Sequence, residues 1–150
     1  MEKFMAKALK EAEKALSENE VPIGAVIVKD GKIIAKAHNK RQQSKIATHH
    51  AEILAIEKAC KKVGDWRLEG AEIYVTLEPC PMCAGAIANA RINKLIFGAF
   101  DKTGTNKNLL TDILSDNRLN HKTEVVGGVL ENSCKKILTD FFEEKRRKNK

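Results

Sequence analysis

Four residues in two short motifs have the types and the spacing of a metal site with an acid–base group beside it. His50 and Glu52 form a His-x-Glu motif, and Cys80 and Cys83 form a Pro-Cys-x-x-Cys motif. Zinc prefers nitrogen and sulfur ligands in a tetrahedron, and a catalytic zinc site keeps one of its four positions for water. His50, Cys80 and Cys83 would supply three ligands, so the sequence predicts one Zn²⁺ per chain with one position left for water.

Glu52 is predicted to act as a general acid and base and not as a metal ligand. Zinc lowers the pKa of bound water toward ~7, and a carboxylate close by can accept its proton and deliver it elsewhere. The two motifs together match the general signature of zinc-dependent nucleobase deaminases, in which a zinc hydroxide attacks the base. We therefore expect an enzyme of this class.

Two other interpretations of the cysteine pair stay open at this point. A Cys-x-x-Cys pair can be a redox couple, although its surroundings here are not thioredoxin-like. A structural zinc site would need a fourth ligand from Cys60, Cys134 or a histidine. Cys60 and Cys134 fall on apolar helical faces, which is typical of core thiols. His49 adjoins the predicted ligand, but the His-x-Glu spacing selects His50 and leaves His49 as a loop residue or a substrate contact.

Both motifs are predicted to stand at the starts of helices, where the positive end of the helix dipole stabilises thiolates. Apolar spacing predicts one helix over residues 50–62 with Gly64 at its end. Pro81 is suited to the first position of a second helix over residues 81–90. The polar residues 38–47 are predicted to form a loop before the first of these helices.

The rest of the chain is predicted to alternate strands with helices. An Asp30-Gly31 turn joins two strands into a hairpin, which predicts tight antiparallel pairing. Strands alternating with helices predict an α/β fold with helices packed on a sheet. The final helix should bury at least one of Phe141 and Phe142, and Trp66 should anchor a loop against the core. The predicted strands are 23–28, 32–37, 71–77, 95–99 and 124–129. The further helices are 4–16, 109–115 and a final one that places Cys134, Ile137, Leu138, Phe141 and Phe142 on one face.

Composition limits the class of protein. With 150 residues the chain fits one domain, which we expect to span residues 1–150. No apolar run approaches the ~20 residues needed to cross a bilayer, and the first residues lack the apolar stretch of a secretory signal. A cytoplasmic, reducing location is therefore expected, and there the four cysteines should be free thiols or metal ligands and not disulfides. The net charge of +7 favours an anionic partner.

Beyond the metal motifs, nearly the whole sequence resembles the bacterial tRNA-specific adenosine deaminases of the cytidine/deoxycytidylate deaminase superfamily. The resemblance implies a cytidine deaminase-like three-layer sandwich with a mixed five-stranded sheet covered by helices, and a homodimer. It also implies hydrolytic deamination of adenosine to inosine at the wobble position of a tRNA anticodon, with zinc-bound hydroxide attacking C6 of adenine and Glu52 as proton shuttle. The matching segments are 21–26, 50–53, 74–86, Asn120-His121, 128–130 and 140–142.

Position by position, the resemblance also implies contacts with the tRNA anticodon stem-loop. Asn39 matches the asparagine that hydrogen-bonds the target base, for which an amide with both donor and acceptor is suited; otherwise it would be a turn-former. Ala51, Asn120, His121 and Arg146 are the other expected substrate contacts. Between residues 143 and 150, five basic residues outweigh two acidic ones, an excess suited to phosphates.

Two segments depart from the family pattern, and two other function classes remain open. Ile46–His49 replace the usual Asp-Pro-Thr-Ala before the zinc histidine, and Lys107-Asn108 replace the usual Gly-Ser. The first alternative is a deaminase of free nucleobases or nucleosides of the guanine or cytosine type. The second is a non-catalytic zinc-stabilised module that binds nucleic acid. The basic final helix favours tRNA over a free base, and Glu52 argues against a non-catalytic role.

Overall fold

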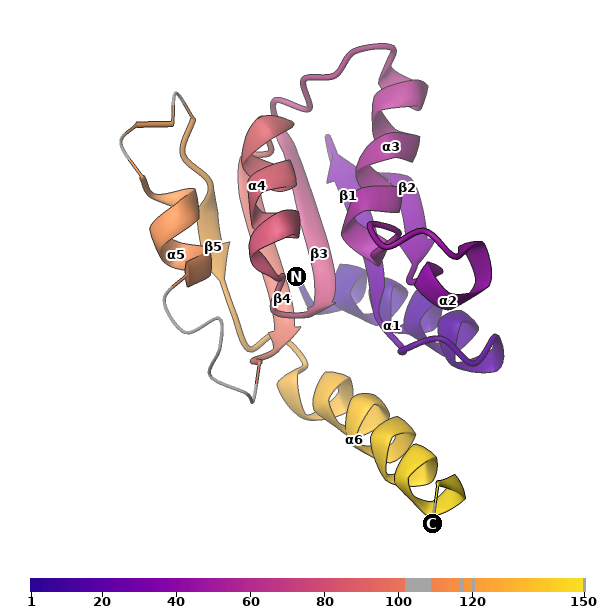
Figure 1. The fold of residues 1–150 in the computed structure, drawn as a ribbon. Coiled ribbons are helices and arrows are strands. Elements are labelled where there is room, and N and C mark those ends of the chain that lie inside the picture. The colour runs from indigo at the N-terminus through magenta and orange to yellow at the C-terminus, as the bar shows by residue number, and fades with distance from the viewer. Residues whose placement is uncertain (102–108, 117, 120, 150) are drawn as a thin grey trace.

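The fold was analysed in a computed structural model that describes residues 1–101, 109–116, 118–119 and 121–149. Figure 1 shows one sheet with helices on both faces. The strands are ordered β2-β1-β3-β4-β5. Their bounds are β1 Gly24–Lys29, β2 Lys32–His38, β3 Ala71–Leu77, β4 Lys94–Ala99 and β5 Glu124–Val126. The helices are α1 Glu2–Ser17, α2 Arg41–Ser44, α3 Ala51–Val63, α4 Pro81–Asn89, α5 Leu109–Leu114 and α6 Glu131–Lys148.

The sheet is mixed, as predicted. β1 pairs antiparallel with both β2 and β3, whereas β3, β4 and β5 run parallel. Asp30 and Gly31 both have positive φ, 52° and 75°, which is the backbone of the tight hairpin turn expected between β1 and β2. Parallel neighbours need a crossover connection, and α4 supplies it between β3 and β4.

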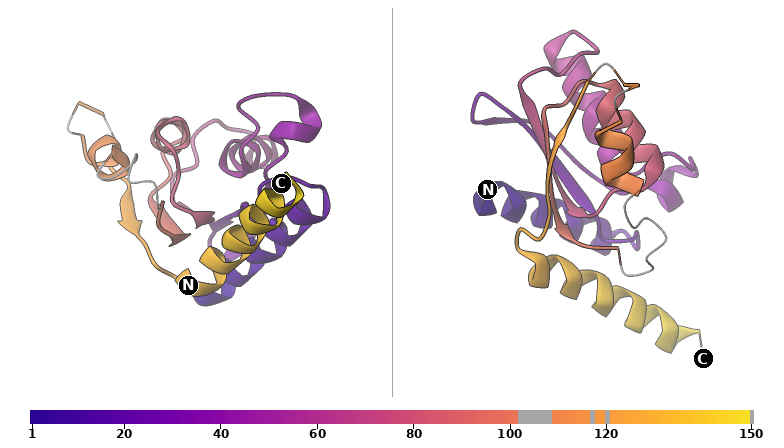
Figure 2. Two further views of the ribbon diagram at one scale, coloured as in Figure 1. Left: turned by 60° about the horizontal axis from the view of Figure 1, so that its bottom comes forward. Right: turned by 90° about the vertical axis from the view of Figure 1, so that its left-hand side faces the viewer.

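Alternate residues along the strands point to opposite faces of the sheet. They contribute to two hydrophobic cores, one between the sheet and each layer of helices. Ile27, Ile73 and Leu95 belong to the core that also contains buried residues of α3 and α4. Their neighbours Val26 and Tyr74 point to the other face, where the core includes residues of α1 and α6. Figure 2 shows α1 and α6 on one side of the sheet and α3, α4 and α5 on the other. The predicted three-layer sandwich is therefore confirmed.

Several local expectations were wrong for identifiable reasons. The polar loop after β2 contains the short helix α2, and β5 ends at Val126 rather than at residue 129. Phe141 is only partly buried and Phe142 is 43% exposed, because α6 continues beyond the sheet and only Cys134 and Leu138 are buried along it. Trp66 is 55% exposed and does not anchor a loop in the core. Its ring instead lies 5.4 Å and 5.6 Å from the guanidinium carbons of Arg67 and Arg91.

The two helices that carry the chemical motifs begin at the same end of the sheet. β3 ends at Leu77, and α4 begins four residues later at Pro81. α3 packs against β1, β2 and α4, so its first turn lies beside the first turn of α4. α3 ends as predicted at Gly64, whose φ of 79° is the left-handed conformation that closes many helices. Within the described residues, no helix is long and apolar enough to cross a bilayer.

Candidate active site

The starts of α3 and α4 bring the two sequence motifs together. His50 is the N-cap residue of α3, and Cys80 is the N-cap residue of α4, both with extended backbone. Cys83 follows in the first turn of α4 and is fully buried. Pro81 is tolerated in the first turn of α4 without loss of stability. Proline lacks a backbone N–H, and the first N–H of a helix has no intrahelical acceptor.

The donor atoms of these residues fit a tetrahedral zinc ion. The Nδ1 of His50 lies 3.8 Å from the Sγ of Cys80 and 3.6 Å from the Sγ of Cys83. One ligand atom from each residue lies within 4.8 Å of the others. With Zn–N bonds of about 2.0–2.1 Å and Zn–S bonds of about 2.3 Å, tetrahedral ligands stand roughly 3.6 Å apart. The observed separations agree with this spacing, and the site has three protein donors, as in catalytic zinc sites.

The cluster favours a thiolate at Cys80. Hydrogen bonding with Cys83 and then with His50 lowers the pKa of the Cys80 thiol to about 4, against the opposing effect of burial. The hydrogen bond with Cys80 raises the pKa of His50. Cys83 has the opposite tendency, because its hydrogen bond with the Cys80 sulfur and its burial raise its pKa. A metal cation deprotonates a coordinating thiol, so both sulfurs could then be ligands.

Glu52 lies in the first turn of α3, and its side chain is turned into the protein. The residue is only 4% exposed. Burial raises the pKa of Glu52, while its own backbone amide and the charge of His50 oppose the increase. Hydrogen bonding with the Cys83 thiol has a smaller effect in the same lowering direction. A carboxyl group with a raised pKa, next to a candidate metal site, is suited to accept and return a proton.

Two of the expected substrate contacts lie next to this cluster. Asn39 directly follows β2 and is 7% exposed, and its side-chain amide has no hydrogen-bond partner in the part of the chain that the structure describes. The next residue, Lys40, donates its backbone N–H to the carbonyl of His49 at 3.1 Å, so Asn39 is held near the start of α3. Ala51 is buried at the first position of α3, where a backbone N–H has no intrahelical acceptor.

The other expected contacts are placed differently. His121 lies at the opposite end of the sheet, where its Nε2 is 2.6 Å from the carbonyl oxygen of Ile92, just before β4. The structure therefore does not bring His121 to the cluster. Asn120 and the atypical Lys107-Asn108 lie outside the described residues. Ile46 in the atypical segment before His50 is 45% exposed.

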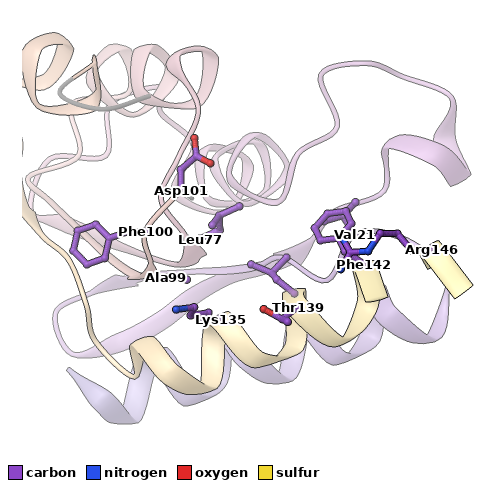
Figure 3. Close-up of a pocket in the computed structure, with 10 residues that line it drawn as sticks. Val21, Leu77, Ala99, Phe100, Asp101, Lys135, Thr139, Phe142 and Arg146 are labelled. Atoms are coloured by element: carbon purple, nitrogen blue, oxygen red, sulfur yellow. The ribbon is translucent and has the colours of Figure 1, made fainter. Parts of the chain in front are cut away.

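Arg146 lines a pocket of about 300 Å³ between α6 and the ends of β3 and β4 (Figure 3). Leu77 and Ala99, the last residues of those strands, form one wall. Phe142 and Arg146 extend over it from α6. Because Leu77 is only three residues before Cys80 in the chain, the pocket opens at the same end of the sheet as the cluster of His50, Cys80 and Cys83. Arg146 could be selected from the sequence, but the pocket could not, because it depends on how α6 packs.

A set of buried acidic residues on and after α1 was not predicted from the sequence. Glu11 and Glu20 are 4% and 0% exposed, and Glu18 is paired with His38. The burial of Glu11 could have been predicted from the sequence, because this residue lies between Ala8 and Ala12 on the apolar face of the helix. A charged residue on such a face is buried only when it is paired.

Comparisons with known proteins give a consistent result. A family model described as MafB19-like deaminase matches residues 1–146. The tRNA-specific adenosine deaminase of Bacillus subtilis strain 168 is 54% identical over 149 residues, which is 99% of this chain and 92% of that protein. A solved chain from studies of A-to-I editing by tRNA:A34 deaminases at the wobble position has a TM-score of 0.84 and 44% identity, covering 90% of this chain and 98% of that one. A guanine deaminase from Bacillus subtilis has a TM-score of 0.63 and 42% identity, covering 66% of this chain and 64% of that one.

Proposed function

Because this chain belongs to the family of bacterial tRNA-specific adenosine deaminases, we propose that it converts adenosine to inosine at the wobble position of a tRNA anticodon. The observation that carries the proposal is the meeting of His50, Cys80 and Cys83 beside the buried Glu52. These are the residue types that nucleobase deamination requires. We further propose that residues 1–150 act as one catalytic domain.

His50, Cys80 and Cys83 are the proposed ligands of one zinc ion. Their spacing and their nitrogen and sulfur donors support zinc over a hard cation such as magnesium, which prefers oxygen ligands. Zinc bound there would supply a Lewis acid that makes a water molecule acidic near neutral pH. A structural four-ligand site is disfavoured, because no other histidine, cysteine or carboxylate of the described residues joins this group.

Glu52 is the proposed proton shuttle of the reaction. In hydrolytic deamination a C6–O bond forms, the C6–N6 bond breaks, and adenosine and water become inosine and ammonia. The carboxylate of Glu52 moves both protons of the attacking water: the first goes to N1 of the base, and the second goes from the new C6 hydroxyl to the departing N6, which leaves as ammonia. The raised pKa of Glu52 brings its two protonation states closer in free energy, which both halves of this transfer require.

Asn39, Ala51 and Arg146 are the proposed substrate contacts of the described chain. The Asn39 amide offers a donor and an acceptor to the target base, and the first N–H of α3 offers a second donor. Arg146 and its basic neighbours extend from the pocket wall and are suited to phosphates of the RNA backbone. His121 and Asn120 remain expected contacts with the anticodon stem-loop. Because His121 bonds to the Ile92 carbonyl, its contact would lie away from the reacting base.

We also propose a homodimer and a cytoplasmic location. Gly85 and Ala86 of α4 lie, with Arg118 and Leu119, along a groove of about 490 Å³. The small α4 side chains permit close packing of a second chain against this helix. Light scattering at micromolar concentration tests the dimer, and a monomer under those conditions would contradict it. The cytoplasmic location follows from the proposed tRNA substrate.

A deaminase of free nucleobases is the second candidate, favoured by one observation. The Bacillus subtilis guanine deaminase is similar in structure and sequence to about two thirds of this chain. The two candidates differ in substrate and not in the zinc chemistry. Incubation of the purified protein with bulk tRNA and with a panel of free bases, followed by measurement of inosine and ammonia, distinguishes them.

A further inference from the structure

Buried carboxylates on one side of the molecule hold the segment that carries Asn39. This segment, residues 38–44, runs from the end of β2 through α2. Glu11 of α1 and Glu20, which follows α1, are both buried, and both hydrogen-bond to this segment. A buried carboxylate is costly unless paired or hydrogen-bonded, so the partners of these two residues are informative.

The first anchor is an ionic group around His38, the last residue of β2. The His38 Nδ1 lies 3.2 Å from the Oε1 of Glu11, and its Nε2 lies 3.0 Å from the Oε2 of Glu18. Both nitrogens of the one ring therefore have a carboxylate oxygen within hydrogen-bond distance. Lys14 adds a 2.7 Å ion pair to the other oxygen of Glu11.

The second anchor is Glu20, which is 0% exposed. Its Oε1 accepts the backbone N–H of Gln42 at 3.0 Å, and its Oε2 accepts that of Gln43 at 2.6 Å. These are donors in the first turn of α2, which the helix cannot satisfy itself. A helix of four residues is too short to be stable alone. The carboxylate of Glu20 therefore fixes α2 from a distant part of the chain.

Asn39 lies between the two anchors, next to the first. Its backbone N–H donates to the carbonyl of Ile23 at 3.1 Å, and the N–H of Lys40 donates to that of His49, the residue before the proposed ligand His50. The amide of Asn39 thus projects from a segment held by His38 on one side, by Glu20 on the other, and by a hydrogen bond to the start of the metal site.

We propose that His38, held by Glu11 and Glu18, and Glu20 are positioning residues for deamination, which place the Asn39 amide relative to the metal cluster without touching the substrate. The inference rests on the proposed function, in which Asn39 contacts the target base. Loss of either anchor should allow Asn39 to move, so the base would be bound less well and in a less productive orientation.

Double-mutant cycles with Asn39 test this proposal directly. Glu20→Gln keeps the shape of the side chain but replaces one of the two acceptor oxygens, and His38→Gln removes the imidazole ring that contacts Glu11 and Glu18. Each is measured alone and combined with Asn39→Ala, with kcat and KM determined on an anticodon stem-loop. Ile92→Val, a buried change at the other end of the sheet, is the control for a modest loss of stability.

We expect each single variant to lower kcat/KM about tenfold or more, with zinc content unchanged and one cooperative unfolding transition above the assay temperature. In the Asn39→Ala background the same substitutions should change kcat/KM less than about threefold, because the group they position is already gone. The proposal would be overturned if Glu20→Gln and His38→Gln lowered kcat/KM as much in the Asn39→Ala background as in the wild type. Unchanged kcat and KM in both single variants would also overturn it.

Two further outcomes are also decisive. If Glu20→Gln does not fold, the His38→Gln cycle alone decides between coupling to Asn39 and independence from it. If the wild type deaminates a free base but no RNA, the proposed function is wrong, and the same cycle measured on that base still tests the positioning role.

Discussion

The Nδ1 of His50 lies 3.6 Å from the Sγ of Cys83, although 33 residues separate them in the chain. This proximity exists because α3 and α4 cover the same face of the sheet and begin at the same end of it. Each helix places its chemical residues at or near its N-terminus, where backbone N–H groups and the helix dipole favour thiolates. The proposed metal site is therefore a consequence of where two helices on one face of the sheet start.

Replacing Cys83 by alanine should abolish stoichiometric zinc binding. The two remaining ligands supply only half of a tetrahedron, which is too few protein donors for a stable zinc site. Cys60→Ala is the matched control, because Cys60 is a partly buried thiol outside the cluster and should leave zinc content unchanged. Elemental analysis of both purified variants checks this. Full zinc occupancy in Cys83→Ala would show that Cys83 is not a ligand.

Substituting Glu52 by glutamine should preserve the fold and the zinc content but lower kcat by about 10²–10⁴-fold, the usual contribution of a general acid–base group. Glutamine keeps the size of the side chain and cannot carry the proton. Single-turnover kinetics on an anticodon stem-loop, with metal analysis of the same sample, measure the effect. Near-normal turnover by a zinc-loaded Glu52→Gln protein would rule out the proposed role.

Much of the fold and the central site could be predicted from the sequence. The strands at β1 to β4 and the two helices of the motifs follow from local apolar periodicity, the Asp30-Gly31 turn, Pro81 and Gly64. The four residues His50, Glu52, Cys80 and Cys83 were selected by type and spacing, and the structure brings the three proposed ligands together.

What could not be predicted depends on packing between distant segments. The exposure of Phe142 depends on how far α6 extends past the sheet. The spacing of apolar residues within α6 cannot predict this distance. The burial of Glu20 depends on two backbone N–H groups more than 20 residues later, in a helix too short to be recognised by periodicity. His121 follows the family pattern, yet its hydrogen bond to Ile92 places it far from the cluster.

Glu11 should make stability depend on pH in acid. Burial opposes its ionisation, but hydrogen bonds and charges of Lys14 and His38 outweigh burial and hold the pKa of Glu11 below its ordinary value of 4.5. A group with a lowered folded-state pKa stabilises the protein above its unfolded pKa, and this contribution is lost as pH falls through the folded value. Glu18 faces the same imidazole ring from the other side.

Glu11→Gln should therefore destabilise the protein by about 1.5–3 kcal/mol at pH 7, the usual range for hydrogen bonds to charged groups. The difference from wild type should shrink as pH falls below about 4.5. Urea unfolding at a series of pH values measures it. A difference that stays constant from pH 7 into acid would mean that ionisation of Glu11 contributes nothing.

Removal of basic residues from α6 should weaken RNA binding in a salt-dependent way. Arg146→Ala combined with Arg147→Ala should lower affinity for an anticodon stem-loop and flatten the slope of log affinity against log salt by about 0.7 for each phosphate that the variant no longer neutralises. The matched control is Lys61→Ala with Lys62→Ala, an equal change of charge at the end of α3 away from the pocket. Equal effects in both pairs would show that only net charge matters.

The most direct test of the proposed function is mass spectrometry of tRNA after incubation with the zinc-loaded wild-type protein and with its Glu52→Gln variant. We expect inosine to appear at the wobble position of a tRNA with the wild type, with one ammonia released per inosine, and to be nearly absent with the variant. Wild-type protein that leaves tRNA unchanged and releases ammonia from a free base such as guanine would contradict this function.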